Sequence, residues 1–116
     1  AAYLLPRVVG QRRALELLLF GDAIDAETAA NYGIANRVLP HDDLLPAAYE
    51  WARRLADGPS LAIAMTKRMV NNEWNMDMVS ALEAEAQAQA LLMMGDDHRI
   101  FHEAFREKTQ PKFSGR

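Results

Sequence analysis

Residues 14–40 read ALELLLFGDAIDAETAANYGIANRVLP, and this stretch is the most informative part of the chain for the fold. Its leucine-rich start belongs to a helix predicted over residues 8–20, and Gly21 stands where a helix C-terminus favours a residue without a Cβ atom. Asp25 is placed to cap a short second helix that ends at the next glycine. The branched apolar residues that follow predict a short extended segment over residues 34–40, closed by its proline.

The rest of the sequence predicts four further helices, each marked by apolar residues at helical spacing and bounded by a break rich in glycine, proline, asparagine or aspartate. They are expected over residues 42–56, 59–74 and 78–94, and over a last stretch that ends near residue 108. The chain is therefore expected to be mainly α, with six helices and one short strand. Because a lone strand has no sheet to join, and the apolar first residues have nothing before them to contact, we expect partner structure beside this chain.

Composition excludes several classes of function. The chain has 116 residues and a formal net charge of −3, so it offers no bulk attraction to nucleic acid. Its apolar stretches are too short to span a bilayer, and we therefore expect neither a nucleic-acid nor a membrane partner. The sequence has no cysteine, which excludes disulfides, thiolate nucleophiles and cysteine metal sites, and fits a reducing cytoplasm.

Four motifs, in order and at the right spacing, resemble the second half of the enoyl-CoA hydratase/isomerase (crotonase) superfamily. They are LLPRVVG at 4–10, the stretch at 14–40 quoted above, DDLLPAAYEWARRLADGPSLAIAMTKRMVN at 42–71, and GDDHRIFHEAFREKTQPKFSGR at 95–116. The resemblance covers essentially the whole chain and implies the C-terminal helical part of an α/β crotonase-like spiral fold. Residues 1–40 would end the spiral core, and residues 41–116 would form helices that build the oligomer.

What the resemblance implies about activity is specific. In this family an N-terminal half supplies the backbone N–H groups that bind the thioester oxygen, together with the catalytic carboxylates. We therefore expect that half to lie outside this chain, and no catalytic residue is assigned here. The implied substrate is an acyl-CoA, with coenzyme A as part of the substrate and no further cofactor or metal. The implied assembly is a homo-trimer or a dimer of trimers.

The reaction stays open between hydration of an enoyl-CoA and movement of its double bond. Residues 1–7 read AAYLLPR where many hydratases of the family have a GGTQRLPR type of approach, and this departure is similar to several isomerases. Another CoA-ester reaction on the same scaffold, by a hydrolase or a decarboxylase, is an alternative. So is a non-catalytic helical oligomerisation fragment. A small all-α protein-binding domain is disfavoured by the short strand and the abrupt apolar start.

Lys108 and Phe105 are the candidate CoA-binding residues. Lys108 matches a lysine that approaches the CoA phosphates in similar proteins, where its compact charge suits phosphate. Lys112, and more remotely Arg106 and Arg116, could add to the positive field. The alternative is that Lys108 is a solvated cation favoured by the helix dipole. Phe105 could pack near the adenine, although a core contact with a phenylalanine one turn away is the more ordinary interpretation.

Two histidines and two pairs of glutamates are further candidates for a site. His98 and His102 lie four residues apart, on one helical face, but a third metal ligand is not evident, so a surface or interface role is expected. The glutamate pairs, Glu83 with Glu85 and Glu103 with Glu107, are interpreted as solvated helix faces.

The methionines of the chain gather in and after the fourth and fifth predicted helices. They are Met65, Met69, Met76, Met78, Met93 and Met94. Flexible thioether side chains suit an adaptable buried surface, so we interpret them as core residues, with a subunit interface as the second possibility.

Overall fold

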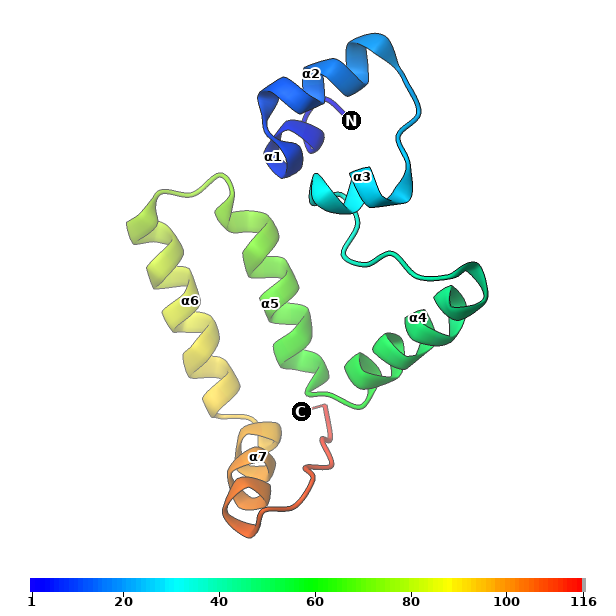
Figure 1. The fold of residues 1–116 in the computed structure, drawn as a ribbon. Coiled ribbons are helices and arrows are strands. Elements are labelled where there is room, and N and C mark those ends of the chain that lie inside the picture. Colours follow the sequence, from blue (N-terminus) through cyan, green and yellow to red (C-terminus); the bar gives the residue numbers. More distant parts are fainter. Residues whose placement is uncertain (116) are drawn as a thin grey trace. The chain divides into compact units, whose positions relative to one another are not determined.

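The computed structural model describes residues 1–115, which form seven α-helices and no β-strand (Figure 1). The helices are α1 (Leu5–Val9), α2 (Gln11–Phe20), α3 (Ala26–Asn31), α4 (His41–Ala56), α5 (Ser60–Glu73), α6 (Met78–Met93) and α7 (Asp96–Glu107). The chain divides into two compact units, Ala1–Leu44 and Leu45–Arg116. Within the described part of the chain, every helix is too short or too polar to cross a membrane.

In the first unit, α1 packs against α2. The prediction of one helix over residues 8–20 was wrong, because the chain breaks at Gly10. This glycine has φ 84°, a backbone conformation that side chains other than glycine's rarely adopt. Gly10 ends α1 by donating its N–H to the Pro6 carbonyl at 3.0 Å, and it starts α2 by accepting the Ala14 N–H at 3.1 Å. The two short helices bury one apolar side chain each, Val9 and Ala14.

The capped short helix that was predicted after Asp25 is confirmed as α3. The Asp25 carboxylate accepts the N–H of Thr28 at 2.7 Å, which satisfies one of the free donors at the helix start. The short strand predicted over residues 34–40 was wrong, since these residues are irregular and Ile34 and Val38 are exposed. A strand needs a neighbour to bind its backbone N–H and C=O groups, and residues 1–115 supply none.

In the second unit, α6 packs against both α5 and α7 (Figure 1). The helices predicted over residues 42–56, 59–74 and 78–94 are confirmed to within a residue or two, and α7 ends one residue before the predicted end. The predicted breaks, rich in glycine, proline, asparagine or aspartate, separate these helices in the structure. Pro46 lies inside α4, in its second turn, so the helix lacks the hydrogen bond that an N–H at this position would donate to the carbonyl four residues back.

Very little apolar surface is enclosed. In the second unit, as far as residue 115, the buried apolar side chains are Ala88 on α6 and Ala104 on α7. Large apolar side chains are exposed on every long helix, including Leu19, Phe20, Leu45, Trp51, Leu55, Val70, Met78, Leu91, Met94 and Phe105. The methionines Met76, Met78, Met93 and Met94 are exposed, so the structure does not support their interpretation as core residues within this chain. The helices therefore present apolar faces that this chain alone leaves uncovered.

The cap of α6 gives an acid-dependent contribution to stability. Asp77 accepts the N–H groups of Val79 and Ser80 at 3.0 Å each and the Ser80 hydroxyl at 2.7 Å. These bonds, led by the one from the Ser80 hydroxyl, hold the pKa of Asp77 below its usual value. A carboxyl with a lowered folded pKa stabilises the fold above its unfolded pKa of about 3.9, and the contribution is lost as the pH falls below that value.

We expect Asp77→Asn to lower the melting temperature at neutral pH and to remove part of the destabilisation that acid causes in the parent chain. Circular dichroism melts at several pH values measure both effects. Asp57→Asn is the control, because Asp57 directly follows α4 and contributes its backbone N–H to the Arg53 carbonyl at 2.8 Å, a bond that the variant keeps. An unchanged acid response in Asp77→Asn would show that the cap is not the source of the pH dependence.

Candidate functional site

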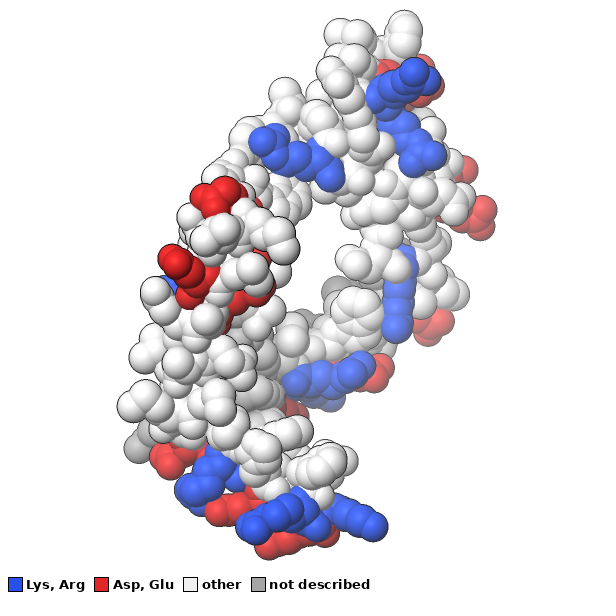
Figure 2. Space-filling model, turned by 90° about the vertical axis from the view of Figure 1, so that its left-hand side faces the viewer, with Lys and Arg blue, Asp and Glu red and all other residues white. Residues whose placement is uncertain are grey.

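The predicted CoA-binding residues lie on α7 and just after it, in a region rich in both signs of charge. Asp96 and Asp97 occupy the first turn of α7, where the helix dipole favours anions. Arg99 bridges Asp96 at 3.5 Å and Glu103 at 3.0 Å along the exposed face, and these partners hold the pKa of its guanidinium above its usual value, Glu103 contributing most. Figure 2 shows acidic and basic side chains intermingled at the lower end of the view, which α7 occupies.

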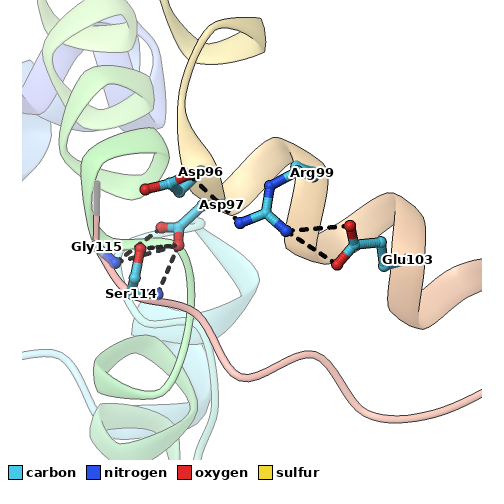
Figure 3. Close-up of polar contacts among 6 residues, drawn as sticks. All are labelled: Asp96, Asp97, Arg99, Glu103, Ser114 and Gly115. Carbon is cyan, nitrogen blue, oxygen red and sulfur yellow. Dashed lines mark hydrogen bonds and ion pairs between the residues drawn. The ribbon is translucent and has the colours of Figure 1, made fainter.

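Asp97 fixes the C-terminal tail to the start of α7. Its Oδ1 accepts the Ser114 N–H at 2.6 Å and the Ser114 hydroxyl at 3.0 Å, and both carboxylate oxygens accept the Gly115 N–H, at 3.2 and 3.1 Å (Figure 3). Asp97 is the one buried charged side chain among residues 1–115. A buried carboxylate is tolerated here because hydrogen-bond donors surround it. Gly115 also comes close to the start of α5, since a Cβ atom on it would lie 2.8 Å from the Ser60 hydroxyl.

The tail forms one wall of a mostly apolar cavity. The cavity has a volume of about 240 Å³ and lies where α5, α6, α7 and the tail meet. It is lined by Pro59, Leu61, Ala62, Gln89, Leu92, Gly95, Asp97, His98, Phe101 and Phe113. Because Phe113 directly precedes Ser114, the Asp97 contact holds this aromatic side chain against the cavity.

Lys108 ends α7 in a strained backbone conformation. Its φ of 55° and ψ of 37° are left-handed, and it is the one non-glycine residue with positive φ among residues 1–115. The turn is held by the Thr109 N–H, which donates to the Ala104 carbonyl at 2.9 Å. Side chains with a Cβ atom disfavour this region by about 1–2 kcal/mol. A lysine is therefore held at a position where glycine would be favoured, at the end of the helix.

Phe105 stacks on Phe101 at a ring-centroid distance of 6.2 Å, with the ring planes 25° apart. The predicted contact between the two phenylalanines is confirmed, but Phe105 remains 73% exposed, so the pair does not form a core within this chain. Lys112 is exposed in the tail that follows α7. Arg116 lies outside the described residues.

Of the other predicted candidates, Glu83, Glu85 and Glu107 are exposed, as expected for solvated helix faces. Glu103 is bound by Arg99, and Glu85 lines a second cavity of about 510 Å³ between α5 and α6. Glu73 lines the same cavity and has one buried carboxylate oxygen without a hydrogen-bond partner in the described structure. His98 and His102 contact each other through their ring nitrogens.

Comparison with known proteins identifies the family. The sequence profile described as enoyl-CoA hydratase/isomerase matches residues 1–116, the whole chain. This chain belongs to the enoyl-CoA hydratase/isomerase family. The resemblance found from its sequence motifs is thereby confirmed.

Two curated members of the family show how the match extends. The 1,2-epoxyphenylacetyl-CoA isomerase of Escherichia coli (strain K12) is 32% identical over 114 residues, which cover 98% of this chain and 44% of the relative. The crotonyl-CoA hydratase of Syntrophomonas wolfei is 33% identical over 109 residues, which cover 94% of this chain and 42% of the relative. This member of the family therefore spans less than half the length of the curated relatives that it matches.

Solved structures of family members superpose closely on the chain. A candidate enoyl-CoA hydratase from Streptomyces coelicolor A3(2) matches with a TM-score of 0.95 and 47% identity, covering 99% of this chain and 42% of that one. An enoyl-CoA hydratase from Bacillus anthracis matches with a TM-score of 0.92 and 32% identity, covering 97% of this chain and 43% of that one. The helices described here thus have the arrangement found in part of the crotonase fold.

Sequence reasoning missed the anchor between Asp97 and the tail. The contact joins residues 17 and 18 positions apart, so no helical spacing or local turn pattern could reveal it. The available signal was a Ser-Gly pair beyond Pro111, where the helix cannot continue and the backbone N–H groups need acceptors.

We expect Asp97→Ala to release the tail. The variant leaves the N–H groups of Ser114 and Gly115 without their acceptor, and the free energy of unfolding should fall by about 1–3 kcal/mol. Limited proteolysis measures whether the tail becomes accessible, and denaturant unfolding measures the stability. Asp96→Ala is the matched control, since the neighbouring Asp96 is exposed and contacts Arg99 instead. Equal proteolysis of both variants would contradict the anchoring role.

Proposed function

We propose that this chain is the C-terminal helical part of an enzyme that acts on acyl-CoA thioesters by hydrating an enoyl-CoA double bond or by moving it. The observation that carries the proposal is the match of the family profile to all 116 residues. One relative, 28% identical and from Mycosarcoma maydis, is named an enoyl-CoA isomerase/hydratase, and another, 33% identical, is named a crotonyl-CoA hydratase, so both reactions are retained. Binding of the thioester oxygen and proton transfer at carbon 2 belong, in this proposal, to a preceding half of the protein.

The exposed apolar surface supports a division of labour along the chain. Residues 1–40 would close the edge of the catalytic spiral, and residues 41–116 would build a homo-trimer or a dimer of trimers. Exposed side chains such as Leu19 and Phe20 on α2, and Trp51 on α4, are expensive to leave in water. Burying them against the preceding half, or against other subunits, would recover that free energy.

Lys108 and Phe105 are proposed to contact coenzyme A. Lys108 lies at the end of α7 with its side chain exposed, and its ammonium group can donate charge-assisted hydrogen bonds to a phosphate. Phe105 lies one helical turn before it and has an exposed ring, which suits stacking against an adenine base. Lys112 would add to the positive field from the tail.

An activity assay tests the proposed reaction. We expect the complete gene product that contains this chain to turn over crotonyl-CoA or a 3-enoyl-CoA, and the 116-residue chain alone to be inactive. Chromatographic separation of the CoA esters distinguishes hydration from isomerisation. If the complete product leaves both substrates unchanged, the proposal fails. Release of free CoA thiol, without hydration or isomerisation, would instead favour a hydrolase, and unchanged substrates combined with self-association would favour an oligomerisation module.

A set of lysine variants tests the CoA contact within the complete product. Lys108→Ala should raise the KM for the acyl-CoA by about tenfold and leave kcat nearly unchanged, because a charge-assisted bond to bound phosphate is lost. Lys108→Gly removes the same charge but suits the left-handed turn, so it should weaken binding equally while stabilising the fold by about 1 kcal/mol.

Lys67→Ala is the matched control, because Lys67 is an exposed lysine on a different helix, α5. If all three variants show the parent KM, Lys108 is only a solvated helix end. If Lys67→Ala weakens binding as strongly as Lys108→Ala, the effect is one of net charge rather than of position.

A further inference from the structure

His98 and His102 form an arrangement on α7 that the proposed CoA chemistry does not use. Their Nε2 atoms lie 3.2 Å apart, while their ring centroids are 4.5 Å apart and the ring planes are inclined by 69°. Because the two Nε2 atoms are closer together than the ring centres, these corners of the rings lean toward each other. We propose that His98 and His102 bind a divalent transition-metal ion through both Nε2 atoms. The spacing alone did not favour this role, but the distance between the nitrogens does.

The distance fits chelation of a single ion. Imidazole nitrogens bind zinc at about 2.0–2.1 Å, so two nitrogens 3.2 Å apart subtend an angle of about 100° at the ion. That angle lies between the roughly 90° of square-planar or octahedral sites and the roughly 109° of tetrahedral sites. Both rings can therefore reach one ion with little movement of either side chain.

The proton balance of the pair is simple. In the metal-free pair, the contact is a hydrogen bond only if one ring carries its proton on Nε2 and the other accepts there. In the metal-bound pair, both Nε2 lone pairs face the ion, so both rings carry their proton on Nδ1. One ring must move its proton from Nε2 to Nδ1 through water. Two neutral rings thus bind the ion without a net release of protons.

The surroundings make this a site with two protein ligands. Among residues 1–115, no group of three or more histidine, aspartate or glutamate side chains could hold a metal. Glu103 is held by Arg99, and Asp97 is held by the tail. Water therefore completes the coordination, and metal selectivity comes from the imidazoles alone. Cu²⁺ should bind more tightly than Ni²⁺ or Zn²⁺, and Mg²⁺ and Ca²⁺, which prefer oxygen ligands, should not compete.

Binding would also restrict one side chain that lines the apolar cavity. His98 is half-buried and lines that cavity, whereas His102 is exposed one turn further along α7. An ion bridging the two rings would fix the His98 side chain and link two successive turns of the helix. The ion should therefore stabilise α7 in addition to occupying its surface.

Titration of the chain with CuCl2, NiCl2 and ZnCl2 tests the proposal, followed by calorimetry and by thermal melts. One ion per chain should bind, and the melting temperature should rise. Changes in outer-shell partners at metal sites already cost about 10–100-fold in affinity, so His98→Gln and His102→Gln should each weaken binding by at least about tenfold. Both positions face solvent at least in part, so these variants should keep the helical circular dichroism spectrum of the parent.

Two controls distinguish binding by the His98–His102 pair from binding by any histidine of the chain. His41→Gln removes the remaining histidine, at the start of α4, and should leave binding unchanged. The double variant His102→Gln/Arg106→His keeps the number of histidines on α7 but separates them by two turns, and it should lose binding. The proposal is overturned if this double variant binds as the parent does, if His41→Gln weakens binding equally, or if the parent binds none of the three ions.

Discussion

Contact between the helices of the second unit is limited by the size of the side chains that they enclose. Ala88 and Ala104 are the apolar side chains buried there, whereas leucine, methionine and aromatic residues on the same helices stay exposed. Small side chains allow helices to approach closely but contribute little burial, since the hydrophobic free energy follows the area removed from water. The secondary structure is therefore set locally, by caps and glycine turns. The larger apolar side chains stay exposed, because no other part of residues 1–115 covers them.

The candidate site depends on a long-range polar contact placed on this loosely enclosed scaffold. Asp97 is buried only because the tail brings three donors to its carboxylate. The same contact holds Phe113 against the cavity between α5, α6 and α7. The contact at Asp97 stabilises the start of α7, whereas the left-handed backbone at Lys108 costs free energy at its end, because a residue with a Cβ atom disfavours that conformation. The first turn of α7 thus sets the position of the tail, and its last turn sets the backbone conformation at Lys108.

Most of the helices could be predicted from the sequence because their ends carry local signals. Asp25 caps α3 as its position predicts, and α6 begins where a break in the apolar pattern predicts a helix start. The break at Gly10 was missed because a single glycine within an apolar run is compatible with a continuous helix, and only its positive φ reveals the turn. The strand over residues 34–40 was predicted from branched apolar residues. Such residues indicate a side-chain environment rather than a backbone state, and a strand forms only where a partner is present.

The site was less accessible to sequence reasoning than the fold. Lys108 was predicted from resemblance to a family, and Phe105 from its place one helical turn before Lys108. Residue type predicts neither the strained turn nor the exposed ring. The spacing of His98 and His102 predicts a shared helical face, but it gives no distance between ring nitrogens. The anchor at Asp97 joins segments far apart in the chain, so it emerges only from the folded arrangement.

The exposed methionines give the chain a sensitivity to oxidants. The sequence has no cysteine, so its sulfur chemistry rests on thioethers, and Met94 is 85% exposed at the end of α6. Oxidation would turn a flexible apolar side chain into a polar, chiral sulfoxide, which cannot be buried without a hydrogen-bond partner. Met78 and Met94, at opposite ends of α6, would then lose their apolar character. Peroxide exposure would thus change the apolar faces of the chain while leaving the hydrogen bonds of the helices intact.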